Sequence, residues 1–376
     1  MAVMSPGAFH DSGNKAQEPP RQEGSMPTTL HIPHHPRETL RPTSIIAEGL
    51  LNPRGIHAED DGSLLLVEAG SGLPGDPFTG RISRLPVDPG KPGAYLPRET
   101  LAQGFRAMNM QARMLRDEIM GLSDIACGDG RCLVSQTDYV TGSKLLDLRY
   151  SPPEPVCHSQ GNLNALCYHP GRRSWLAVKP DTNELVELRP GAQEQVLVHL
   201  PHLEQNQEAV PVTLVYEPAT GAVLVSLFSG ELHCDPARKG VDFADKAGQV
   251  IRVWPASGRL EVLIDGLQLP TGLALDPQGN VLVLELCASL QQPLRADWNG
   301  EALHGGFTRF SGRLLHCDLH SGVVSILARE LDTPSNLCLV EGAVVVSEGM
   351  GLSGRPLPTP EGRVVPLDGR LRRVPL

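Results

Sequence analysis

The residues best placed to do chemistry in this chain stand at the ends of six predicted apolar strands. By repeat alignment they are Glu68, Gln136, Lys179, Leu227, Glu285 and Glu348. If they converge on one ring, crowding should raise the pKa of at least one carboxyl group, while Lys179 should lower those of its neighbours. The pattern predicts that Glu285, Glu68, Glu348 and Lys179 are catalytic, with Glu285 as general acid/base. The alternative is that each carboxylate caps backbone N–H groups of the neighbouring repeat.

Two long segments follow the fourth and fifth of these strands, at 227–246 and 285–311. Long loops in a compact domain are often functional. They carry His233, Trp298 and His304, and an earlier loop adds His158. We expect Trp298 and His304 to contact substrate, and His233, His304 and His158 to be candidate ligands of a divalent metal ion. The spacing matches no metal motif, so surface hydrogen bonding by these histidines stays open.

Internal repeats indicate how these residues are positioned. Six copies of one pattern, a turn followed by two apolar strands, begin at Ile45, Met120, Asn162, Val210, Leu263 and Ile326. Their turn residues recur about every 40 to 70 positions, which is typical of four-stranded propeller blades with some long loops. A third strand follows each of the first five copies, and a fourth follows most of them.

The last copy lacks a fourth strand, whereas the first is preceded by a spare one at 43–50. The sequence therefore predicts an all-β fold, a six-bladed β-propeller over residues 40–376, closed by an N-terminal strand in the last blade. Residues 1–39 are expected to be a disordered tail. Within it, prolines make a mobile linker of 31–38 rather than a metal site built from its histidines. The segment 98–120, rich in Met and charges, is the exception and could hold a short helix over the ring; a packed loop is the alternative.

Composition narrows the partners. Lys and Arg number 33 against 43 Asp and Glu, with no basic cluster, so we expect no nucleic-acid partner. No apolar run is long enough for a membrane helix, and the first residues do not resemble a signal peptide. The eight cysteines form no CxxC pair. We expect reduced thiols and a cytoplasmic protein.

The repeats resemble those of the scytonemin-cluster propeller family (ScyD/ScyE-like), within the wider group of NHL-repeat, gluconolactonase and strictosidine-synthase-like six-bladed propellers. The residues that carry the resemblance are LLNPRGIHAEDDGSLLLVEAGSG, VPVTLVYEPATGAVLVSL, GLQLPTGLALDPQGNVLVLEL and TPSNLCLVEGAVVVSEG. The resemblance covers about residues 43–350 and implies an association with secondary-metabolite biosynthesis.

The lactonase relatives bind a divalent ion partly through residues just after the turn. Here those positions hold Arg54, Ser123, Asn164, Val212, Thr271 and Ser335. Only Asn164 is of a ligand type, and Arg54 would repel a cation.

The leading hypothesis is a small-molecule tailoring protein, with the substrate at the channel mouth and bound by Arg54, Asn164, Thr271 and Gln136. One alternative is a non-catalytic scaffold for partner enzymes of a biosynthetic pathway. A second is a metal-dependent lactonase or hydrolase.

Overall fold

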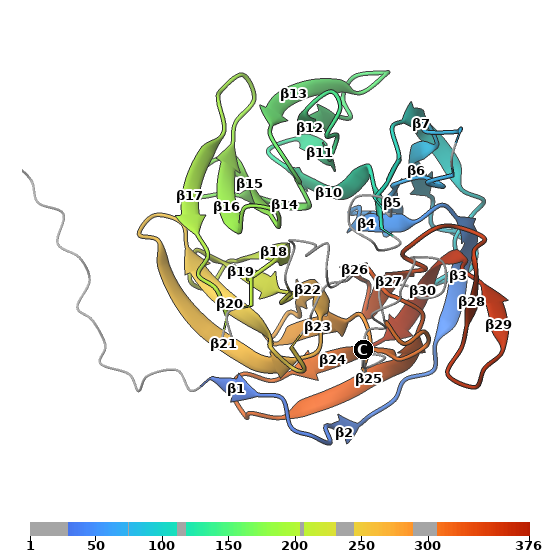
Figure 1. Ribbon diagram of the computed structural model, residues 1–376, viewed down its shortest axis with the longest axis vertical. Helices are drawn as coiled ribbons and strands as arrows, with labels where there is room; N and C mark the ends of the chain where they lie inside the picture. The colour runs from blue at the N-terminus through green and yellow to red at the C-terminus, as the bar shows by residue number, and fades with distance from the viewer. Residues whose placement is uncertain (1–28, 74, 111–117, 204–206, 231–243, 289–306) are drawn as a thin grey trace, which may run out of the picture.

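The chain forms a ring of six β-sheets around a central axis (Figure 1). The computed structural model describes residues 29–73, 75–110, 118–203, 207–230, 244–288 and 307–376. The innermost strands contact one another in the order β4, β10, β14, β18, β22, β26 and back to β4. The prediction of a six-bladed β-propeller is confirmed. No helix occurs in the described ranges, so none there could span a membrane.

Each blade is a four-stranded antiparallel meander, and blades one to six follow the chain. The innermost strands are β4 (Pro53–Ala58), β10 (Leu122–Gly128), β14 (Ala165–His169), β18 (Pro211–Glu217), β22 (Pro270–Leu275) and β26 (Asn336–Val340). The second strands are β5 (Leu64–Glu68), β11 (Arg131–Gln136), β15 (Ser174–Lys179), β19 (Ala222–Leu227), β23 (Val281–Glu285) and β27 (Ala343–Glu348). The third strands are β6 (Gly80–Leu85), β12 (Ser143–Asp147), β16 (Glu184–Leu188), β20 (Gly248–Trp254), β24 (Gly312–Cys317) and β30 (Gly369–Pro375). The outer strands are β7 (Glu99–Phe105), β13 (Glu154–Ser159), β17 (Gln195–His199), β21 (Arg259–Leu267), β25 (Val324–Leu331) and β3 (Ser44–Leu50).

The second strands form the core because both of their faces are covered by neighbouring blades. Strands β5, β23 and β27 are buried along their whole length, which explains their continuous apolar runs. Apolar clusters fill each seam; one of them joins Leu65 and Val67 of blade one to Val134 and Leu146 of blade two. Burial of each such side chain contributes about 1.5–3 kcal/mol. The ring is therefore held mainly by packing between blades.

The N-terminal part of the described chain runs along the outer edges of blades four, five and six (Figure 1). Strand β1 (Leu30–His31) pairs parallel to β21, β2 (Arg37–Glu38) pairs parallel to β25, and β3 pairs antiparallel to β30. Ile32 packs into the core between blades four and five. The expectation that 31–38 is a mobile linker is therefore wrong, because these residues satisfy the edge strands' backbone groups and bury an apolar side chain. Residues 1–28 lie outside the described residues.

The segment 98–120 is extended wherever it is described. Glu99–Phe105 is the outer strand of blade one, and β8 (Met108–Asn109) pairs with β9 (Ile119–Met120). The expected helix is wrong for these parts, since pairing with β6 outweighs the helix propensity of single residues. Residues 111–117 lie outside the described residues. A further hairpin, β28 (Pro356–Pro358) with β29 (Val364–Pro366), interrupts blade six between its second and third strands.

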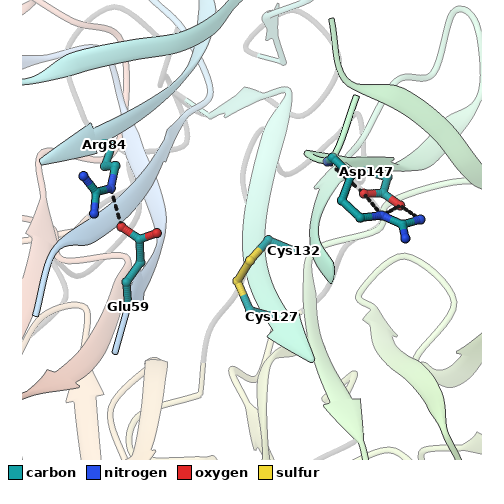
Figure 2. The surroundings of a disulfide bond; sticks show 6 residues. Glu59, Arg84, Cys127, Cys132 and Asp147 are labelled. Atoms are coloured by element: carbon teal, nitrogen blue, oxygen red, sulfur yellow. Dashed lines mark hydrogen bonds and ion pairs between the residues drawn. A yellow bond between two sulfur atoms is a disulfide. The ribbon is translucent and has the colours of Figure 1, made fainter. Parts of the chain in front are cut away.

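A disulfide joins Cys127 and Cys132 across the hairpin between β10 and β11, as Figure 2 shows. The two residues are direct cross-strand partners, and both turn residues, Asp129 and Gly130, have positive φ, as a tight two-residue hairpin requires. The expectation of reduced thiols is wrong for this pair. Cys157, Cys167, Cys317 and Cys338 are free thiols, and burial raises the pKa of Cys167 and Cys317.

Candidate functional site

The residues that follow the six turns meet at the axis and line one small cavity. Its lining is Arg54, Ser123, Asn164, Ala165, Val212, Thr271, Ser335 and Asn336. The cavity has a volume of about 20 Å³, and one water needs roughly 10–15 Å³. It therefore has room for one or two waters, and a larger ligand would have to lie above it.

Most polar groups of this lining are engaged with the next blade. The Asn164 amide donates to Val212 O at 2.7 Å, the Ser335 hydroxyl to Pro53 O at 2.7 Å, and the Thr271 hydroxyl to Pro334 O at 3.1 Å. These bonds run from one innermost strand to the next around the ring. They hold the channel narrow, so two predicted site residues, Asn164 and Thr271, have a structural task.

Arg54 is the cation of the axial cavity. Its guanidinium donates to Ile119 O at 2.8 Å and contacts the Met350 sulfur at 3.3 Å. Burial lowers the pKa of Arg54, and nearby Glu118 opposes that shift. An arginine stays protonated nonetheless, so a fixed positive charge stands at the axis, as the sequence predicted.

Asp124 is a candidate that the sequence analysis missed. It follows Ser123 on β10 and is 7% exposed. Its Oδ2 accepts Leu166 N–H at 3.0 Å, and its Oδ1 accepts the Asn336 amide at 3.1 Å. Burial raises the pKa of Asp124 to about 7, against the opposing effect of these donors. Among the described residues it forms no ion pair, so this carboxyl group can exchange a proton near neutral pH.

Glu68, by contrast, is fully neutralised within blade one. It is completely buried, and its carboxylate accepts Leu51 N–H at 2.7 Å. Arg81, its cross-strand partner on β6, binds both carboxylate oxygens at 2.9 Å. Arg98 adds a third contact at 2.7 Å.

Glu285 repeats this arrangement in blade five. Its carboxylate accepts Gln268 N–H at 2.7 Å and pairs with Arg313 at the start of β24. Burial raises the pKa of Glu285, and Arg313 and the Gln268 N–H oppose the shift. The raised pKa fits the expectation for a general acid/base, but the contacts are those of a structural ion pair.

Glu348 shows the arrangement in blade six, again completely buried. It accepts Asp332 N–H at 2.9 Å and pairs with Arg370 at 3.0 Å and with Arg372. The three glutamates thus bind arginines of their own blades, which differs from the predicted arc facing Lys179 across the channel. They match the capping alternative, because each caps the connection that leads from the outer strand of the preceding blade to the innermost strand of its own.

The capped turns have a strained backbone, and the carboxylates stabilise it. The residue before the turn proline has a left-handed φ in four blades: 59° at Asn52, 47° at Val210, 51° at Leu269 and 45° at Thr333. Such a conformation costs about 1–3 kcal/mol for a non-glycine residue. In blades one, five and six, the glutamate accepts a hydrogen bond from the N–H of the residue that precedes the left-handed one. This bond holds the turn in place. We call this Glu–Arg–turn unit the blade staple.

The other three blades depart from the staple in different ways. Blade three reverses its charges, because Lys179 faces Glu184 across the strands at 3.7 Å and bonds Glu194 at 2.9 Å. Blade four has Leu227 opposite Gln249. Blade two has Gln136 opposite Lys144, and these two line a cavity at the seam of blades one and two, away from the axis.

The remaining predicted site residues come from the long loops. His233, Trp298 and His304 lie outside the described residues. His158 is exposed on β13, opposite Lys144. Within the described ranges, no group of three His, Cys, Asp or Glu residues could hold a metal ion. The axial donors do not fit a divalent cation either, because Arg54 shares their cavity.

No family model matches the chain, and no curated protein matches it. Solved structures do resemble it. A Bacteroides thetaiotaomicron protein of unknown function has a TM-score of 0.53 and 14% identity, over 89% of this chain and 75% of that one. A Xanthomonas campestris gluconolactonase has a TM-score of 0.41 and 14% identity, over 73% of this chain and 90% of that one. A Staphylococcus aureus virginiamycin B lyase has a TM-score of 0.46 and 10% identity, over 89% and 98%. At these identities the likeness is one of fold, and such propellers differ in function.

Proposed function

We propose that the protein is a tailoring enzyme of secondary metabolism that converts a small polar or anionic molecule at the channel mouth. The observation that carries this proposal is Asp124, a buried carboxyl group whose pKa is raised to about 7, bonded to a residue of the axial cavity. General acids and bases work best when their pKa lies near the working pH. The resemblance of the repeats to the ScyD/ScyE-like family supports the secondary-metabolite context.

In this proposal the substrate lies above the axial cavity, which forms its floor. Arg54 orients an anionic or carbonyl oxygen, and Asp124 exchanges a proton, directly or through a cavity water. Glu68, Glu285, Glu348 and Lys179 stay outside the reaction because each is committed to buried ion pairs. Cytoplasmic location stays a prediction, and the Cys127–Cys132 disulfide would be more typical of an oxidising compartment.

A screen against metabolite extracts tests this proposal. Purified protein should deplete at least one small anionic compound, followed by liquid chromatography and mass spectrometry. Asp124→Asn should lower the conversion rate by about 100-fold or more, the usual share of a general acid/base. Asp60→Asn, an equal charge change at an exposed turn, should leave it unchanged. Conversion by the Asp124 variant at the wild-type rate would rule the proposal out.

A non-catalytic scaffold is the second candidate, and the narrow axis favours it. The hydrogen bonds from Asn164, Thr271 and Ser335 close the channel to about 20 Å³. A scaffold would convert nothing in the screen, and partner enzymes would bind wild type and Asp124→Asn equally. No specific observation favours the metal-dependent lactonase, since the axial donors do not suit a divalent ion.

A further inference from the structure

A cavity of about 310 Å³ opens at the seam between blades one and two. This volume lies at the lower end of the range for small-molecule sites, roughly 300–1,000 Å³. Its lining combines apolar and charged groups: Phe78, Gly104, Phe105, Arg106, Gln136, Asp138, Thr141, Lys144, Leu146, Pro153 and Pro155. All of these residues are described, and none belongs to the axial cavity.

At the polar end of this cavity, the two positions that hold the glutamate and arginine of the blade staple form no ion pair. Gln136 and Lys144 occupy the positions that Glu68 and Arg81 hold in blade one. Blades one, three, five and six close this position with an ion pair. Blade four places an apolar Leu227 there. Only blade two, among the described residues, combines a charge and an amide without pairing them.

Gln136 is 3% exposed, and its carboxamide has no hydrogen-bond partner in the described part of the chain. Its amide atoms are not among the fully buried polar atoms that lack a partner, so the carboxamide faces the cavity, where a ligand can reach it. The Lys144 ammonium likewise has no acceptor among the described residues, although a cation so placed attracts one. Two donors without a protein acceptor therefore line one cavity, an arrangement that suits an acceptor-rich ligand.

The second cation of the cavity is already neutralised. Arg106 pairs with Asp138 at 3.4 Å, and its guanidinium lies 4.9 Å from the centre of the Phe78 ring. The Asp138 carboxylate also accepts the Thr141 hydroxyl at 2.6 Å. The net charge that remains for a ligand is therefore the single positive charge of Lys144.

We propose that the seam of blades one and two binds a small aromatic carboxylate, with its carboxylate on Lys144 and Gln136 and its ring against Phe78, Phe105 and Leu146. One uncompensated cation matches a monoanion, whereas a phosphate dianion would keep excess negative charge. Phe78 has Arg106 over its ring and still exposes 53% of its surface, which leaves aromatic surface for a flat ring. This inference does not depend on the axial chemistry proposed above.

The test measures binding of 1-naphthoate and of its neutral counterpart 1-naphthamide to the full chain by isothermal titration calorimetry. We expect 1-naphthoate to bind at least about tenfold more tightly, because only the anion gains a charge-assisted hydrogen bond from Lys144. Equal affinities, or no binding of 1-naphthoate, would overturn the proposal. This comparison uses the wild-type protein alone, so it holds whether or not the variants fold.

Two variants locate the site. Lys144→Met removes the charge and keeps the length, and Gln136→Glu supplies the carboxylate that closes this position in blade one. Both should weaken 1-naphthoate binding at least about tenfold, because the first removes the cation and the second occupies it. Lys91→Met and Gln278→Glu, which make the same charge changes at exposed positions, should bind like wild type. Wild-type affinity in either seam variant, with melting temperatures showing a folded protein, would place the ligand elsewhere.

Discussion

Blade six and blade two treat the end of the second strand in opposite ways. In blade six, Glu348 is buried against two arginines and a turn N–H, so its charge is fully matched. In blade two, Gln136 and Lys144 occupy the corresponding positions with no ion pair between them. The repeat sets one position, which four blades close with an ion pair, blade four fills with Leu227, and blade two, in our proposal, leaves for a ligand. The blades with an ion pair show that this position contributes to stability. Blade two shows that the same position can be left free for binding.

The largest effect is expected when the carboxylate of a complete blade staple is removed. Glu348→Gln should lower the free energy of unfolding by about 3–5 kcal/mol, because two arginines lose their buried counter-charge. Urea denaturation at neutral pH measures this change. Glu361→Gln removes an exposed carboxylate 3.9 Å from Arg363 and should leave the free energy of unfolding nearly unchanged. A loss near 1 kcal/mol for Glu348→Gln would mean that the staple is not a stabilising unit.

Asp124 is a buried carboxyl group without a cation, and it contrasts with the glutamates that pair with arginines. Asp124 has only neutral donors, and its folded-state pKa of about 7 lies above its ordinary value of 3.8. The folded protein therefore holds a proton that the unfolded chain releases, so this contribution to stability is complete below about pH 4 and is lost as the pH rises towards 7. Relative to Asp124→Asn, the wild type should lose at most about 1.4 kcal/mol of unfolding free energy for each pH unit in this window.

Urea denaturation of both proteins at several pH values between 4 and 8 gives this difference. If the two stability profiles run parallel, the carboxyl group has an ordinary pKa. It could then not serve as the general acid/base of the proposed function.

The smallest effect is expected on closing the open copy. Gln136→Glu should stabilise the protein by about 1 kcal/mol, because its carboxylate meets Lys144 as Glu68 meets Arg81. In a Lys144→Met background the same change should destabilise it, since the buried carboxylate then lacks a partner. A double-mutant cycle should give a coupling energy of about 1–3 kcal/mol. Additive effects would show that the two side chains do not meet.

The fold was predictable because propeller repeats state the same pattern six times. Strand order, the turn positions and the set of residues at the axis all follow from aligning the copies. The contacts of the strand-end residues did not follow. Repeat alignment places Glu68, Glu285 and Glu348 at one level but does not say whether they point to the axis or to the next strand. The missing signal was the Gly-Arg pair that begins the third strand at 80–81, 312–313 and 369–370.

Other features escaped for separate physical reasons. Asp124 lies one residue beyond the position that the lactonase comparison selects, where the other copies carry Gly55, Ala165, Thr213, Gly272 and Asn336 and none is a carboxylate. Strands β1 and β2 have two residues each, too few for any periodicity. The disulfide could have been predicted from the sequence, because Cys127 and Cys132 flank a Gly-Asp-Gly turn that places them opposite each other.

The path of residues 30–50 along three consecutive blades has a consequence for how the chain matures. These residues leave the ribosome well before their partners β21, β25 and β30, which lie far later in the chain. Until those partners are made, β1, β2 and β3 have no strand to pair with, and strands left unpaired in that period invite association with other chains. A cut near residue 40 would separate β1 and β2 from the ring. The link between β2 and β3 is therefore where a protease could release these two edge strands without cleaving a blade.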